Sequence, residues 1–175
     1  MLGRPAGAQV AELQGIVEAY FTSMQSLQRL CTRCKSTAKL DDRDDSVLAG
    51  PLDGRGKVTV VIPKRLLGGD GRKDLTPVVP TGETLTVPHS ADLANDATHA
   101  ATRRIVAMIC HLGLHVGGGH YIAYVKRGNS WWCCNDTSVR EVVGGIDTVR
   151  QQLIERAPRG ETLVAALFAW SPPNP

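Results

Sequence analysis

Residues 117–139 read GGGHYIAYVKRGNSWWCCNDTSV, and this stretch predicts an antiparallel pair of strands with a histidine at its mouth. The first strand, residues 121–126, follows three glycines and His120. Residues 127–130 (RGNS) have the composition of a tight turn, which would return the chain alongside that strand. The returning strand would then bring Asn135 and Asp136 beside His120.

The residue types in this stretch suit proton transfer. Glycines before His120 let the backbone approach closely and leave one face of the imidazole open. An Asn or Asp beside the ring would accept a hydrogen bond from one imidazole nitrogen and orient the ring as a general base. That is the third member of a Cys-His-Asn or Cys-His-Asp triad. A histidine beside glycines is also commonly a structural or surface residue, so the Gly-His pair alone does not establish a site.

The whole string resembles the histidine box of ubiquitin-specific proteases, which reads GGHY-x-AY, a turn, a Trp, then Asn/Asp-Asp and a Val. The residues in matching places are Gly118, Gly119, His120, Tyr121, Ala123, Tyr124, Trp131, Asn135, Asp136 and Val139. The resemblance implies that His120 is the general base, Asn135 its orienting partner and Asp136 an adjacent acidic residue that assists. Cys134 departs from the pattern, because an aromatic residue is usual there.

The resemblance covers almost the full chain in the family's own order. Residues 58–66 (VTVVIPKRL) resemble the family's strand ending in Leu-Lys-Arg-Phe, and residues 87–93 resemble its short Phe-Pro … Leu-Asp segment. Residues 13–34 resemble the helix and knuckle at the base of the fingers, and residues 167–168 resemble the closing strand. The implied fold class is α+β. It is mainly antiparallel sheet, of the papain-like cysteine protease palm in its ubiquitin-specific protease form, with an N-terminal helix and one later helix.

Periodicity predicts the individual elements. Apolar gaps of three and four predict one helix or two short ones in residues 8–30, and a later helix at 146–156 with Asp147 as its N-cap and residues 158–160 as its stop. Strands are predicted at residues 58–62, 84–87, 104–111, 121–126, 130–134 and 163–170. The first of these is expected to be buried, and the last would also suit a short buried helix. Loops are expected at residues 41–45 and 68–74.

The composition is that of an ordinary globular protein. Of the 175 residues, 42% are hydrophobic and 21% charged, which predicts one domain over residues 1–175 with a flexible tail at 171–175. The net charge is +3 and the basic residues are scattered, so nucleic-acid binding is not favoured. No apolar run reaches signal-peptide or membrane-span length, and the five cysteines do not suit a disulfide framework. We therefore expect an intracellular protein, cytoplasmic or nuclear, outside the membrane.

Cys31-Thr-Arg-Cys34 is half of a tetrahedral zinc site, because structural zinc sites need four nitrogen or sulfur ligands. No second CxxC pair occurs in the sequence, and the other histidines have no ligand-like spacing to this one. Reduced buried thiols are therefore the default expectation, with bound zinc as the alternative and no other cofactor implied.

Several other residues have ordinary structural interpretations. Cys133 and Cys134 are adjacent on a predicted strand, so one should lie in the core and the other at the periphery. Residues 131–132 (WW) are expected to pack the hairpin rather than stack on a ligand. His111 and His115 are expected at the surface of a strand and of a loop.

The nucleophile of the resembled family lies in a Gly-Asn-Thr-Cys-Tyr-like segment that opens a helical thumb, and the sequence contains no such segment. Cys31 and Cys34 fall in the knuckle, Cys110 in a strand, and residues 133–134 in the strand leading to Asn135. The oxyanion donors near the nucleophile are also missing, and each is worth ~10²–10³ in rate. This chain alone is therefore expected not to hydrolyse an isopeptide bond.

Three function classes stay open: the palm half of a ubiquitin-specific protease whose thumb is on another chain or removed, a pseudo-protease that binds ubiquitin or a ubiquitin-like protein, and a structural subunit of a larger assembly. Survival of His120, Asn135 and Asp136 together favours the first class or a recent loss of activity. The start at Met1, directly after the place of the thumb, favours the second or third. A missing thumb would expose apolar surface near His120, which predicts a protein partner or self-association there.

Overall fold

The computed structural model describes residues 9–22, 25–30, 37–42, 58–65, 71–87 and 101–170. Its centre is a seven-stranded sheet in the order β10-β9-β8-β7-β11-β4, with β6 pairing to β7 off this path. All pairs in this sheet are antiparallel. The strands are β4 Val58–Val61, β6 Thr84–Val87, β7 Ala101–Leu112, β8 His120–Arg127, β9 Ser130–Asn135, β10 Ser138–Val142 and β11 Glu161–Trp170.

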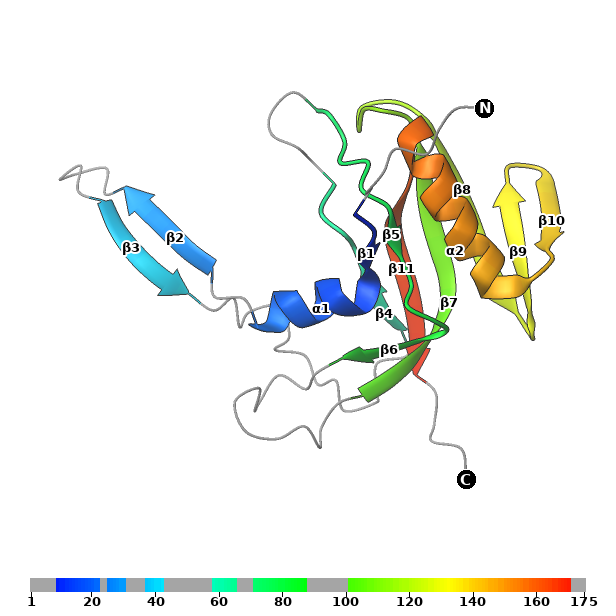
Figure 1. Cartoon of the computed structure of the whole chain (residues 1–175), viewed down its shortest axis with the longest axis horizontal. Helices are drawn as coiled ribbons and strands as arrows, with labels where there is room; N and C mark the ends of the chain where they lie inside the picture. Colours follow the sequence, from blue (N-terminus) through cyan, green and yellow to red (C-terminus); the bar gives the residue numbers. More distant parts are fainter. Residues whose placement is uncertain are drawn as a thin grey trace.

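The remaining elements flank this sheet. They are β1 Ala11–Glu12, α1 Leu13–Thr22, β2 Gln25–Leu30, β3 Thr37–Asp42, β5 Val78–Val79, α2 Gly145–Arg156 and a 3₁₀ turn, η3, at Ala157–Arg159. Helix α2 lies across one face of the sheet, and the β2–β3 hairpin extends away from it (Figure 1). An antiparallel sheet with an N-terminal helix and one later helix confirms the predicted α+β class.

The core lies between the sheet and α2. Its fully buried sheet residues come from β7 and β11, with Tyr124 of β8 and Trp131 of β9, and α2 contributes Val149 and Leu153. Burying an apolar side chain of this size stabilises the fold by roughly 1.5–3 kcal/mol. The apolar residues of β7 and β11 that are at most 1% exposed are Ile105, Met108, Cys110, Leu163, Ala166 and Phe168.

Strand predictions near the histidine box are confirmed. Strands β8 and β9 form a hairpin around Gly128, whose φ of 60° lies in the left-handed region that glycine adopts most readily. Residues 163–170 form part of strand β11 rather than a helix. Helix α2 ends as predicted, through η3 and Gly160, whose φ is 93°.

Three predictions about local structure are wrong. Gly144, not Asp147, is the N-cap of α2, and it forms no side-chain cap hydrogen bond. Helix α1 ends at Thr22, and residues 25–30 form a strand, because pairing of β2 with β3 overrides the local periodicity. Asp41 and Asp42 belong to that same pairing rather than to a loop.

The expected burial of residues 58–62 is also wrong. Val58, Val60 and Ile62 are all more than half exposed, because β4 stands at the edge of the sheet and pairs only with β11 among the described strands. Within predicted loop 68–74, Arg72 forms an isolated bridge with His115.

Some predictions lie outside the described residues, namely the Cys31 and Cys34 pair, Leu93 and the tail at 171–175. In the part of the chain that is described, no helix is both long and apolar enough to cross a membrane.

Candidate active site around His120

The β8–β9 hairpin brings His120 and Asn135 together. Strand β8 begins at His120 and β9 ends at Asn135, and the ladder between them puts Ala123 opposite Cys134. The start of β8 and the end of β9 therefore lie together at the open end of the hairpin. His120 Nε2 lies 2.6 Å from Asn135 Oδ1.

This contact selects one tautomer of the neutral imidazole. An amide oxygen only accepts hydrogen bonds, so the ring proton is on Nε2 and donates to Asn135. The other nitrogen, Nδ1, then has a free lone pair, as a general base requires. The tautomer and the ring orientation are both fixed by a single neighbour on the adjacent strand.

Asp136 is the second acidic or amide residue that the sequence predicts here. Its Oδ2 lies 3.8 Å from His120 Nε2, and the side chains of His120 and Asp136 are 42% and 76% exposed. Such an exposed pair contributes little to stability, roughly 0–1 kcal/mol. Asp136 has a φ of 51°, a left-handed conformation that Asp tolerates in turns.

Three cysteine thiols, Cys110, Cys133 and Cys134, lie in the described part of the chain. Burial raises the pKa of Cys110 and, together with nearby Glu161, that of Cys133, so both thiols stay protonated. Cys133 is buried and Cys134 is partly exposed, as predicted for neighbours on a strand. Because side chains alternate along β9, Cys134 points to the face opposite Asn135.

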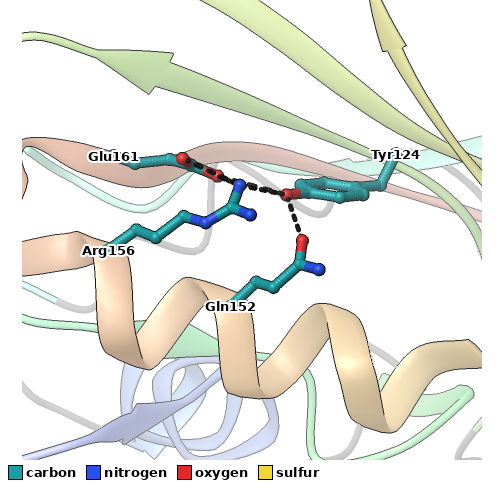
Figure 2. A network of polar contacts seen from close by, with 4 residues as sticks. All are labelled: Tyr124, Gln152, Arg156 and Glu161. Atoms are coloured by element: carbon teal, nitrogen blue, oxygen red, sulfur yellow. Dashed lines mark hydrogen bonds and ion pairs between the residues drawn. The ribbon is translucent and has the colours of Figure 1, made fainter. Parts of the chain in front are cut away.

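A buried polar network fixes β8 to the elements behind it (Figure 2). The Tyr124 hydroxyl lies 2.9 Å from Gln152 Oε1 on α2 and 3.1 Å from Glu161 Oε1 on β11. Arg156 reaches Glu161 Oε2 at 3.4 Å. Burial and the Glu161 charge raise the pKa of Tyr124, so the hydroxyl remains a donor. The network holds the strand that carries His120.

Sequence reasoning missed this network and misplaced one histidine. Tyr124 shares one face of β8 with His120 and Ile122, but no local pattern links it to Gln152 or Glu161. The prediction that His111 lies at the surface is wrong: the residue is 3% exposed, because Lys73 and the loop after β7 cover its ring. His115 is exposed, as expected.

Large apolar side chains are exposed around the strands of the site. Tyr121, next to His120, is 59% exposed, and the others are Leu114, Val116, Val139 and Val143. Among the described residues, no group of three or more His, Cys, Asp or Glu side chains is arranged to hold a metal ion.

The known proteins with similar sequences are ubiquitin carboxyl-terminal hydrolases. The sequence profile of a family described as "Ubiquitin carboxyl-terminal hydrolase" matches residues 75–157, which include the His120–Asn135 pair. Ubiquitin carboxyl-terminal hydrolase 32 of Mus musculus is 40% identical over 55 residues, covering 30% of this chain. Ubiquitin carboxyl-terminal hydrolase 25 of Arabidopsis thaliana is 30% identical over 128 residues, covering 71% of this chain.

Solved structures show the same fold. A yeast SAGA DUB module matches with a TM-score of 0.55 at 18% identity, and a SAGA Ubp8/Sgf11/Sus1/Sgf73 DUB module bound to ubiquitin aldehyde matches with 0.56 at 18% identity. Each match covers 94% of this chain and 34% of the compared chain. The chain spans 3% of the mouse relative and 18% of the Arabidopsis relative.

Proposed function

Because the chain is a member of the ubiquitin carboxyl-terminal hydrolase family through residues 75–157, we propose that it supplies the base half of a cysteine protease site. His120 is the general base, Asn135 orients it, and Asp136 adds negative charge beside it. The attacking thiol comes from a segment outside residues 1–175, on a longer form of this protein or on a second chain. The bond cleaved is at the carboxyl terminus of ubiquitin or a ubiquitin-like protein.

The observation that carries this proposal is the 2.6 Å contact between His120 Nε2 and Asn135 Oδ1. It leaves Nδ1 free to take a proton from a thiol that lies within hydrogen-bond distance of the ring. The resulting thiolate would attack the carbonyl carbon, and the imidazolium would return the proton to the leaving amine. Positioned proton transfer of this kind contributes typically ~10²–10⁴ in rate.

Two further observations support the substrate and the missing nucleophile. Structural neighbours include DUB modules bound to ubiquitin aldehyde and to monoubiquitin. Cys110 and Cys133 are buried with raised pKa values, and Cys134 faces away from Asn135. A partner segment that carries the thiol would also cover exposed apolar side chains such as Tyr121.

The inert thiols equally favour a second candidate, a catalytically dead pseudo-protease that binds ubiquitin or serves as a subunit of an assembly. A ubiquitin probe with a carboxyl-terminal electrophile separates the two functions. It is added to the chain alone and to the chain with its co-purifying proteins or its natural flanking segments.

Labelling of a cysteine outside residues 1–175, reduced at least about tenfold by His120→Ala, is the result expected for the base half of a protease. The matched control is Arg127→Ala, because Arg127 is an exposed residue at the end of β8 that is remote from His120. Ubiquitin binding without labelling supports the pseudo-protease, and absence of binding in every mixture contradicts a ubiquitin substrate.

A further inference from the structure

Lys73 is buried in an unusual setting. Only 4% of the residue is exposed, and its ammonium group has three partners, all of them uncharged. Nζ lies 3.0 Å from His111 Nδ1, 3.0 Å from the His111 carbonyl oxygen and 2.6 Å from the Gly160 carbonyl oxygen. An ammonium has three N–H donors, so these contacts use all of them. Burying a charge is costly, which argues against a purely space-filling role for Lys73.

The Lys73 contact sets the tautomer of His111. A protonated lysine cannot accept a hydrogen bond, so His111 Nδ1 is the acceptor and the ring proton is on Nε2. The ring forms a second hydrogen bond, to the backbone of Gly118. Since the ring N–H is a donor, the Gly118 carbonyl oxygen accepts it. Burial and the nearby Lys73 charge lower the pKa of His111, which keeps this neutral form.

Both ends of the glycine-rich loop are therefore linked indirectly to the Lys73 ammonium group. The far end is linked through the His111 ring, and the near end through the Gly160 carbonyl oxygen. At the far end, the chain runs from Gly118 through Gly119 directly into His120. At the near end, the Gly113 amide donates to the Gly160 carbonyl oxygen at 3.2 Å, and this same oxygen accepts from Lys73. The packing is close: a Cβ on Gly119 would lie 2.5 Å from His111 Nε2.

We propose that Lys73 and His111 are positioning residues, which hold the loop of residues 113–119 and thereby aim His120 at Asn135. This inference rests on the proposed role of His120 as a base. Neither residue touches the reacting atoms, because His111 points to the face of the sheet opposite His120, where its ring packs 4.8 Å from that of Tyr121. The effect passes through the backbone of the loop.

Nuclear magnetic resonance of the full chain tests the inference without ubiquitin or a nucleophile. Ring ¹⁵N spectra of the histidines and amide hydrogen exchange are recorded for the wild type, Lys73→Met, His111→Phe and His111→Gln. Lys64→Met is the matched control, because Lys64 is an exposed lysine on a neighbouring segment. Asn135→Ala supplies the ring signals of His120 without its partner.

In Lys73→Met and His111→Phe, amides of residues 113–119 should exchange about tenfold faster or more, while the core of β7 and β11 keeps its protection. The His120 ring signals should move toward those of Asn135→Ala. His111→Gln should recover much of both, since its side-chain amide still donates to Gly118. Lys64→Met should match the wild type.

Folded variants with wild-type loop exchange and wild-type His120 signals would overturn the proposal. Loss of protection throughout β7 and β11 in both Lys73→Met and His111→Phe would also overturn it, since the pair would then belong to the general core. Failure of ubiquitin labelling would leave these results unchanged, so the two proposals can fail separately.

Discussion

Gly119→Ala compared with Gly118→Ala offers the sharpest local perturbation of the site. A Cβ on Gly119 would lie 2.2 Å from the Leu112 carbonyl oxygen and 2.5 Å from His111 Nε2. The φ of Gly119 is 147°, in the region that side chains with a Cβ rarely adopt. A Cβ on Gly118 would meet nothing within 4 Å, and its backbone has no positive φ. The two neighbours therefore differ in how much room and conformational freedom the fold leaves them.

The magnitude follows from these contacts. A strained backbone conformation costs of order 1–3 kcal/mol, and forced overlap in a packed site typically costs a further 1–3 kcal/mol. Gly119→Ala should lower the free energy of unfolding by about 2–5 kcal/mol, a large share of the roughly 5–15 kcal/mol that folded domains have. Gly118→Ala should change it by less than about 1 kcal/mol, in either direction.

Urea unfolding followed by circular dichroism measures both variants under one set of conditions. The slope of free energy against urea should stay the same, and only the midpoint of Gly119→Ala should fall clearly. Equal midpoints for the two variants would refute the assignment of close packing at Gly119. A larger loss for Gly118→Ala would refute it as well.

Three further outcomes follow from the structure. Burial and the Lys73 charge lower the pKa of His111 below its ordinary 6.5, so the unfolded chain takes up a proton at a higher pH than the folded chain. The free energy of unfolding should therefore fall as the pH drops through and below 6.5. Urea midpoints measured between pH 7.5 and 5.5 should show this decrease, and His111→Phe should reduce it. Tyr124→Phe removes a buried hydroxyl from Glu161 and should cost about 1–2 kcal/mol in thermal or urea unfolding, whereas Tyr121→Phe, at a residue 59% exposed, should stay within about 0.5 kcal/mol. Trp131→Ala empties a fully buried core site and should cost about 3–5 kcal/mol, against less than about 0.5 kcal/mol for Val143→Ala, whose residue is 86% exposed; similar losses for both would contradict the core assignment.

The fold class could be predicted from the family resemblance, and the His120–Asn135 juxtaposition follows from local rules. Strand alternation and the short turn at Gly128 fix the register of β8 against β9, and register decides which residues meet. The strand at residues 163–170 was ambiguous by length alone, and pairing with β7 resolves it.

The errors share one physical origin, namely contacts between residues far apart in the sequence. No sequence pattern near His111 predicts that Lys73, 38 residues earlier, covers its ring. Likewise, the apolar residues of segment 25–30 have helical spacing, but the segment pairs with β3 as an antiparallel strand. The exposure of β4 results from its position at the edge of the sheet, and a short apolar run does not predict the order of strands.

The central claim is that His120, oriented by Asn135, is the base of a site whose thiol lies outside residues 1–175. Its most direct test is the rate of hydrolysis of a ubiquitin carboxyl-terminal amide by the chain joined to, or mixed with, the segment that carries the nucleophile. We predict that His120→Ala lowers this rate by about 10²–10⁴-fold and that Asn135→Ala lowers it less, while Arg127→Ala, at the exposed far end of β8, leaves it unchanged. A His120→Ala complex as fast as the wild type would contradict the account.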